Sequence, residues 1–512
     1  MGCTTILVGK AASADGSALI ARNEDSANGE WNPKRIVVVE PGDQPRHYTS
    51  VISRVEVDLP DAPLRYTAAP NAVLTEGVWG EAGINEANVA MSATETLTTN
   101  TRVLGADPFV ERRGDQPGGI GEEDFLTLVL PYIRSAREGV LRLGALLERY
   151  GTYEMNGVAF SDVDEIWWLE TVGGHHWIAR RVPDDVYVTM PNQLGIDRFD
   201  LADAEGAGAE HLASADLRTF MLDNHLVLDS SFQHELDTFE SRELRATIAV
   251  ALNRNYEASA SILFNPREAF GSHSDADHVY NTPRAWDMQR RLNPSTAGEL
   301  SPESDTIPWA RVPERKLTIE DVKDVLSGHY QGTPYDPYGT TGTAEQRRLY
   351  RPIGINRHSE LSVLQIRPDR PASSRAIQWV AFASNPFNTL VPLYTNVERT
   401  PAYLEGTTAT VSTDSLYWSA RLIAALADAH FADAIPEVER YQEATLALGR
   451  RAVSTTDAQV AELDDDAQVR EALAAANDDL AERIRQDTDA LLGSVLVIAS
   501  NGMRNRFSRS DH

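Results

Sequence analysis

The sequence of 512 residues predicts a mixed α+β fold. Three observations lead to this prediction. Short β-branched and apolar runs separated by turn residues open the chain, and similar runs recur between 157 and 394. Apolar residues follow helical spacing from 122 to 150, and a segment rich in Ala, Leu and Glu at about 415–492 is also typical of helices. A chain of this length can form several units or one large enzyme core.

The expected strands alternate with turn signals along the chain. The turn residues Ala14-Asp15-Gly16 separate the first two strands, and Gly83-Ile84-Asn85-Glu86 joins a later strand pair. Strands are expected at 4–8, 18–21, 35–40, 73–79, 89–94, 157–160, 166–170, 177–181, 186–189, 361–366, 376–383 and 390–394.

Helices are expected in two regions. In the first, apolar spacing predicts helices over 122–150 with breaks near Pro131 and Glu138-Gly139, ended by Gly151 as a cap. In the second, breaks are expected at Pro436 and near Ser454-Thr455-Thr456. The acidic middle, at about 201–313, is expected to form helices and long loops around a sheet core.

Composition and charge exclude several classes of function. The net charge of −29 argues against a nucleic-acid partner, because phosphate backbones are bound by Lys and Arg. No apolar run approaches the roughly 20 residues that span a bilayer, and no basic leader precedes an apolar stretch at the start. We therefore expect a cytoplasmic protein without a membrane partner. Self-association as a homo-oligomer is left open.

No metal or organic cofactor is expected. Cys3 is the one cysteine, so an internal disulfide and a cysteine metal cage are excluded. His175 and His176 are adjacent on an expected strand, where neighbouring side chains point to opposite faces, so they are not expected to chelate one ion together. Asp464-Asp465-Asp466 lacks the alternating ligands of a calcium loop and is interpreted as a helix start or an exposed acidic run.

The candidate chemistry lies at the N-terminus. A cysteine with a free α-amine carries its own base, because that amine has a reference pKa of about 7.7–8.0 and the thiol one of about 8.5. Arg22, a hairpin later, is a candidate to orient the thiolate or a substrate carboxylate, and Asp25 to hold the amine. Cys3 becomes N-terminal only after Met1 and Gly2 are removed.

The sequence resembles a known family, the cysteine Ntn-hydrolase dipeptidases of peptidase family C69. The most specific match is the opening run CTTILVGKAASADGSALIARNEDS. The resemblance covers most of residues 3–410. It continues through Gly83–Glu86, Tyr150-Gly151, Trp168–Thr171, Trp177–Asp184 and Pro191-Asn192-Gln193, and more weakly through 280–295 with Arg284 and Trp286.

The resemblance implies a four-layer αββα sandwich and a set of catalytic roles. Cys3 would be the nucleophile with Arg22 and Asp25 beside it, and Asn192 would donate to the oxyanion. Glu95 stands where related acylases have another Asn, which leaves the second oxyanion donor open and suggests a nearby substrate ammonium. Arg284 matches a distal active-site Arg loosely. The implied organisation is removal of residues 1–2, a catalytic domain at 3–410, and C-terminal helices at 411–512 packed on the core.

The expected function is hydrolysis of dipeptides through a Cys3 thioester, with the freed amine as base. Two alternatives are an amidase or acylase for another small amide, and a non-catalytic descendant that binds proteins. The plainer interpretations of individual residues also stay open. Asn192 after a proline is as typical of a turn as of a catalytic site, and for Glu95 and Arg284 a surface charge or a structural ion pair is slightly preferred.

Overall fold

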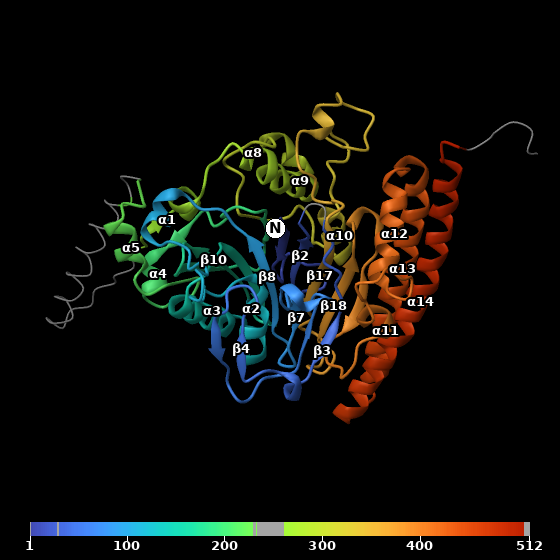
Figure 1. Cartoon of the computed structure of the whole chain (residues 1–512), viewed down its shortest axis with the longest axis horizontal. Helices are drawn as coiled ribbons and strands as arrows, with labels where there is room; N and C mark the ends of the chain where they lie inside the picture. Colours follow the sequence, from blue (N-terminus) through green and yellow to red (C-terminus); the bar gives the residue numbers. More distant parts are fainter. Residues whose placement is uncertain (1, 28–29, 229–231, 233–260, 506–512) are drawn as a thin grey trace, which may run out of the picture.

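The computed structural model describes residues 2–27, 30–228, 232 and 261–505, and it combines sheets with helices (Figure 1). The predicted α+β class is confirmed. The acidic middle segment forms short helices, short strands and loops where it is described, and its residues 229–231 and 233–260 lie outside the described part.

The first sheet has seven strands, and the N-terminal hairpin lies inside it. Neighbouring strands are antiparallel throughout. The register pairs Thr4 with Asn23 and Thr5 with Arg22. The order is β16 (Ala310–Arg311), β12 (Tyr187–Met190), β1 (Thr4–Val8), β2 (Ala18–Asp25), β17 (His358–Ile366), β18 (Ala376–Phe382) and β19 (Val391–Tyr394).

The second sheet has six strands and is also antiparallel. Its order is β14 (His211–Ala213), β11 (His176–Arg181), β10 (Ile166–Val172), β9 (Asn156–Ser161), β8 (Ala90–Thr96) and β7 (Ala82–Ile84). The β8–β9 register shifts between Ala93 and Glu95. A shift of this kind changes which side chains a strand presents to each face.

The two sheets pack face to face over a shared core. Along β1, Leu7 joins a cluster that contains Trp168 of β10, whereas Ile6 joins a different cluster on the opposite face. Successive strand residues point to opposite faces, so β1 is buried on both faces. All five of its residues are accordingly apolar or β-branched.

Helices cover the outer faces of both sheets. On the six-stranded sheet, α2 (Glu122–Val129) and α3 (Ala136–Tyr150) pack against Trp167 and Leu169 of β10. On the seven-stranded sheet, α9 (Thr282–Leu292) and α10 (Ile319–Leu326) share a cluster with residues of β1 and β2. Each of the two sheets therefore packs against helices.

Three long helices end the described chain and lie side by side (Figure 1). They are α12 (Leu416–Asp428), α13 (Phe431–Val460) and α14 (Asp466–Asn501). Trp418 and Ile484 pack in one cluster with Val380 and Val391 of the first sheet. Among the described residues, no helix has the length and apolar character that crossing a membrane would need.

The remaining elements are short. The strands are β3 (Val37–Val39), β4 (His47–Thr49), β5 (Glu56–Asp58), β6 (Tyr66–Ala68), β13 (Phe199–Asp200) and β15 (Leu263–Phe264). The α-helices are α1 (Thr101–Ala106), α4 (Leu201–Glu205), α5 (Leu217–Asp223), α7 (Pro266–Phe270), α8 (Asp277–Tyr280) and α11 (Ala402–Glu405). The 3₁₀ turns are η1 (Pro41–Asp43), η2 (Leu74–Glu76), η3 (Leu130–Tyr132), η4 (Pro294–Glu299), η5 (Gln346–Arg348) and η6 (Asn385–Phe387).

The prediction of a strand at 73–79 is wrong. The segment contains η2 instead, and β7 is the strand that pairs with β8. Gly77 and Trp79 both have a positive φ, which an extended strand does not accommodate. The segment therefore forms a loop with a short 3₁₀ turn despite its β-prone composition.

The expected helix breaks are partly wrong. A break does occur near Pro131, and Gly151 ends α3 with φ +68°. Gly139, however, lies inside α3, where a Cβ would come within 2.4 Å of the Phe160 ring, so close packing explains this glycine. Pro436 and the segment 454–456 lie inside α13. Asp465 caps α14, as the helix-start interpretation of the acidic run predicted.

Candidate active site

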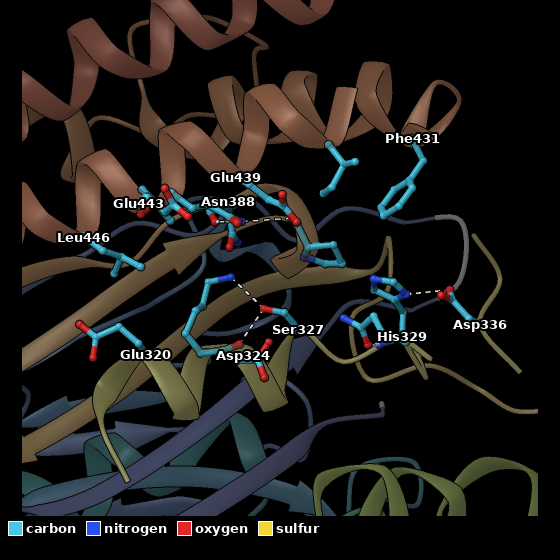
Figure 2. A pocket seen from close by; sticks show the side chains of 16 residues that line it. Glu320, Asp324, Ser327, His329, Asp336, Asn388, Phe431, Glu439, Glu443 and Leu446 are labelled. Atoms are coloured by element: carbon cyan, nitrogen blue, oxygen red, sulfur yellow. Dashed lines mark hydrogen bonds and ion pairs between the residues drawn. The ribbon is translucent and has the colours of Figure 1, made fainter. Parts of the chain in front are cut away.

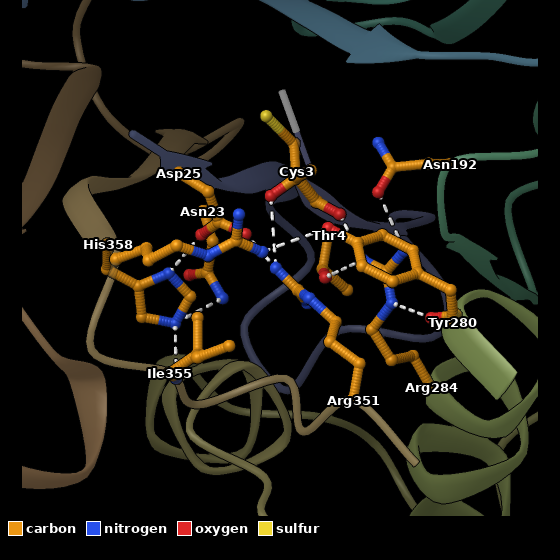
Figure 3. A network of polar contacts seen from close by, with 12 residues as sticks. Cys3, Thr4, Asn23, Asp25, Asn192, Tyr280, Arg284, Arg351, Ile355 and His358 are labelled. Carbon is orange, nitrogen blue, oxygen red and sulfur yellow. Dashed lines mark hydrogen bonds and ion pairs between the residues drawn. The ribbon is translucent and has the colours of Figure 1, made fainter. Parts of the chain in front are cut away.

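Cys3 lies immediately before β1 (Figure 3), and the β1–β2 hairpin brings Arg22 back to it. Arg22 Nη1 donates a hydrogen bond to Cys3 Sγ at 2.9 Å. The thiol is fully buried, and burial raises its pKa against the opposing effect of Arg22. Cys3 is therefore protonated at neutral pH in the chain that retains Gly2.

Buried carboxylates hold the Arg22 guanidinium in place. Arg22 forms an ion pair with Glu81, lies 3.7 Å from Glu122 and donates to the Ala93 carbonyl at 2.7 Å. Lys34 lies behind this group and contacts Glu81 at 3.1 Å. An arginine fixed in this way presents a defined N–H group to the sulfur.

Asp25, at the end of β2, is buried and has two partners from the 351–358 segment. It forms an ion pair with Arg351 and accepts a hydrogen bond from Nδ1 of His358. Burial and nearby positive charges, Arg351 first among them, hold the pKa of His358 well below its usual range. The His358 ring is therefore neutral, donates from Nδ1 and accepts the Ile355 N–H at Nε2 over 3.2 Å.

A second polar group surrounds the start of β1 from the other side. Arg284 Nη1 donates to the Cys3 carbonyl and, at 2.7 Å, to the Thr4 hydroxyl. Its Nη2 donates to Asn192 Oδ1 at 2.7 Å. The Asn192 amide nitrogen donates to Glu95 Oε1 at 2.8 Å and to the Thr96 carbonyl at 2.9 Å. Both amide hydrogens of Asn192 are thus engaged.

Glu95 and Arg284 are fully buried, so the surface-charge interpretation of these residues is wrong. Glu95 also accepts from the Thr5 hydroxyl at 2.8 Å. Burial raises the pKa of Glu95 to about 8, although Arg284 and Thr5 oppose this shift. Burial also raises the pKa of Glu122 to about 8, and the neighbouring Glu81 adds to this shift.

Gly2 is buried against Tyr280. Arg351 Nη2 donates to the Gly2 carbonyl at 3.1 Å. A Cβ at position 2 would lie 2.2 Å from the Tyr280 hydroxyl, so the site accepts glycine alone without rearrangement. Tyr280 also accepts from Arg357 at 3.0 Å.

Four of the residues around Cys3 carry no signal that sequence reasoning could use: Glu81, Glu122, Arg351 and His358. Tyr280 is the first residue of the weakly matching stretch 280–295. The structure brings together all six predicted site residues, namely Cys3, Arg22, Asp25, Glu95, Asn192 and Arg284. They come from four distant parts of the chain, namely the N-terminal hairpin, β8, the loop after β12 and α9, and only the tertiary fold makes them neighbours.

A cavity of about 540 Å³ lies elsewhere, between α10, α13 and the 329–336 loop (Figure 2). Carboxylates line much of it, including Glu320, Asp324 and Glu439. Lys323 borders it and donates to Ser327 Oγ at 2.8 Å. Burial lowers the pKa of Lys323 to about 7.

The geometric reason for rejecting a metal at His175 and His176 is wrong. Both rings approach one carboxylate, with Nδ1 of His175 at 2.9 Å and Nδ1 of His176 at 2.7 Å from Asp107. His175 lies in the turn before β11, where strand alternation does not apply. Among the described residues, no three His, Cys, Asp or Glu side chains group in a way that could hold a metal ion.

Comparison with known proteins gives a consistent result. The family model of peptidase family C69 matches residues 2–444. The chain is 58% identical to a dipeptidase of Bifidobacterium longum and 52% identical to a probable dipeptidase A of Streptococcus pyogenes serotype M3, each over the full length of both chains. It is 43% identical to dipeptidase A of Lactobacillus helveticus over 96% of both chains.

Proposed function

The chain belongs to peptidase family C69 and is an enzyme, and we propose that it hydrolyses dipeptides with the Cys3 thiol as nucleophile. The hydrogen bond of 2.9 Å from Arg22 Nη1 to Cys3 Sγ carries this assignment. A guanidinium beside a sulfur favours the thiolate, which is the reactive form of cysteine. The names of the relatives, dipeptidases at 43–58% identity, support the substrate class.

Removal of Met1 and Gly2 would activate Cys3. In the chain that retains Gly2, the nitrogen of Cys3 is a peptide nitrogen without basicity, and the buried thiol is protonated. A freed α-amine has a reference pKa of about 7.7–8.0 and can accept the thiol proton. Loss of Gly2 would also vacate the space in front of Tyr280 and Arg351, which then becomes available to substrate.

The reaction then proceeds in two steps, acyl transfer to the Cys3 thiol and hydrolysis of the resulting thioester. The thiolate attacks the scissile carbonyl, and the protonated amine of Cys3 gives its proton to the leaving amino acid as the C–N bond breaks. Water, deprotonated by the same amine, hydrolyses the resulting thioester and restores the thiol. Asp25 forms an ion pair with Arg351, which itself donates to the Gly2 carbonyl, so Asp25 lies close to the nitrogen that would become this amine.

Asn192 is the proposed oxyanion donor. Its two amide hydrogens bind Glu95 and the Thr96 carbonyl, so one of these bonds must be exchanged for the substrate oxygen. Arg284 fixes the Asn192 oxygen and thereby the orientation of the amide. Because the amide orientation is already fixed, the reorganisation is limited to the exchange of that one hydrogen bond.

We also propose that the layered architecture is the αββα sandwich of the Ntn hydrolases. Two antiparallel sheets in contact, helices on both outer faces and a cysteine at the start of a central strand support it. The proposed organisation is a catalytic domain at 3–410 and a helical region at 411–512. Contacts of Trp418 and Ile484 with the first sheet support packing of this region on the core.

The test combines intact mass with a dipeptidase assay on protein expressed without an N-terminal tag. We expect the mass of active wild type to lack Met1 and Gly2. Cys3→Ala should abolish hydrolysis of Ala-Ala, and Cys3→Ser should reduce it by at least about 100-fold because a hydroxyl ionises far less readily than a thiol. Full activity in Cys3→Ala, or in protein that retains Gly2, would refute the mechanism.

A further inference from the structure

Arg351 is a buried guanidinium with unused donors. Its side chain is 6% exposed. Nη2 is engaged by Asp25 and the Gly2 carbonyl, whereas Nε and Nη1 have no hydrogen-bond partner. Unpaired donors of a buried charged group are costly unless a ligand completes them. When Gly2 leaves, Nη2 loses one acceptor as well.

The surroundings of Arg351 carry excess positive charge. Arg357 hydrogen-bonds to the Tyr280 hydroxyl at 3.0 Å, and the guanidinium carbons of Arg284 and Arg351 lie 5.0 and 5.2 Å from the Tyr280 ring. Among the described residues, Asp25 is the carboxylate that forms an ion pair with Arg351. Burial, and after it the neighbouring Arg357, lowers the pKa of Arg351 to about 9.

Buried carboxyl groups lie beside Arg22 and Asn192, in the other part of the site. Glu95 and Glu122 are buried there, and the pKa of each is raised to about 8. Glu122 Oε1 has no hydrogen-bond partner. The site therefore offers guanidinium donors near Gly2 and buried carboxyl groups that a bound cation would ionise, and these match the two ends of a zwitterionic peptide.

We propose that Arg351, assisted by Arg357, binds the C-terminal carboxylate of the dipeptide substrate in the space that Gly2 occupies. The proposal rests on the proposed function and adds the orientation of the substrate. The leaving amino acid points toward Tyr280, and the substrate ammonium points toward Glu95 and Glu122. A site that holds both charged ends selects dipeptides over longer peptides, because an added residue moves one charge out of reach.

The test compares Ala-Ala with alanyl-alaninamide, in which a neutral carboxamide replaces the carboxylate. We expect wild-type kcat/KM to favour the free acid by roughly 10- to 150-fold, the range of a hydrogen bond to a charged group. Hydrolysis of acid and amide at equal rates would overturn the inference and leave the proposed function intact. Hydrolysis of neither compound would overturn the proposed function itself.

The variants then assign the selectivity to Arg351. Arg351→Met should bring the acid-to-amide ratio close to one, and Arg357→Gln should lower it less, mainly through KM. Arg367→Met is the matched control, because it removes a buried arginine that pairs with Asp457 away from Cys3. It should retain the wild-type ratio even if stability falls. An unchanged ratio in both Arg351→Met and Arg357→Gln would also overturn the inference.

Discussion

Arg22 Nη1 lies 2.9 Å from Cys3 Sγ, and the same guanidinium forms an ion pair with Glu81. One side chain therefore links the nucleophile to a buried group of carboxylates. The link explains how an arginine stays fixed in orientation beside a sulfur that burial alone would keep protonated. Its consequences for activity can be separated from its consequences for stability.

Replacing Arg22 should affect the thiol more than the fold when charge is kept. Arg22→Lys retains a cation for Glu81 but loses the fork that reaches both groups. We expect kcat to fall by about 100-fold or more, and the pH midpoint of iodoacetamide labelling to rise. Arg22→Met should in addition lower the free energy of unfolding by about 3–5 kcal/mol, because it leaves buried carboxylates unpaired. An unchanged labelling midpoint in Arg22→Lys would contradict the role.

Gly2 should be required for efficient maturation. A Cβ at position 2 would meet the Tyr280 hydroxyl at 2.2 Å. We expect intact mass to show retained residue 2 in Gly2→Ala. Tyr280→Phe removes the clashing oxygen, so the double variant should recover processing at least in part. Equal processing of wild type and Gly2→Ala would show that this contact does not limit maturation.

Asn192 should act on the rate more than on binding. Asn192→Ala removes the proposed oxyanion donor, and kcat on Ala-Ala should fall by about 100- to 1000-fold with a small change in KM. Asn192→Asp is the comparison, because it keeps the size but replaces the amide donor with an acceptor and should be at least as impaired. A change confined to KM would assign Asn192 to substrate binding instead.

The sequence could predict the part of the site that one hairpin builds. Cys3 and Arg22 are 19 residues apart, and β1 and β2 fix their register through local pairing. Arg284 and Glu95 were harder to predict, since a charged residue in isolation is more often exposed. Their burial depends on Asn192, Thr5 and the Cys3 carbonyl, which lie far away along the chain.

Arg351 and His358 show where sequence reasoning ends. Both lie about 350 residues after Cys3 and reach it because β17 pairs with β2 in the first sheet. Periodicity predicted β17 as a strand but not its neighbour. Pro436 is a second example, because the sequence suggested a helix break there. It lies near the start of α13, where packing of the long helix offsets one lost backbone hydrogen bond.

Glu95 should make stability depend on pH. Its folded pKa is about 8, above the unfolded value of about 4.3, so the folded chain holds a proton that the unfolded chain loses between these values. Its contribution is fully present below about pH 4.3 and is lost as pH rises toward 8. Glu95→Gln should flatten the decline of unfolding free energy over pH 5–8 by up to about 1.4 kcal/mol per pH unit.

Denaturant unfolding at several pH values measures this effect. Glu405→Gln, which changes an exposed carboxyl, is the matched control and should keep the wild-type slope. Identical slopes in wild type and Glu95→Gln would mean that Glu95 is ionised in the folded protein. In that case the buried negative charge beside Cys3 is larger than inferred.

The C-terminal helices should unfold together with the sheets. Leu473 of α14 is fully buried in the cluster that contains Ile6 and Trp379, whereas Leu496 of the same helix is 51% exposed. Leu473→Ala should lower the free energy of unfolding by about 2–5 kcal/mol, since it leaves a cavity. Leu496→Ala should change it by no more than about 0.5 kcal/mol. Because Leu473 shares a buried cluster with Ile6 of β1, this loss of stability should shift a single cooperative transition in urea unfolding. A separate early transition in Leu473→Ala would instead show that residues 411–512 unfold as an independent unit.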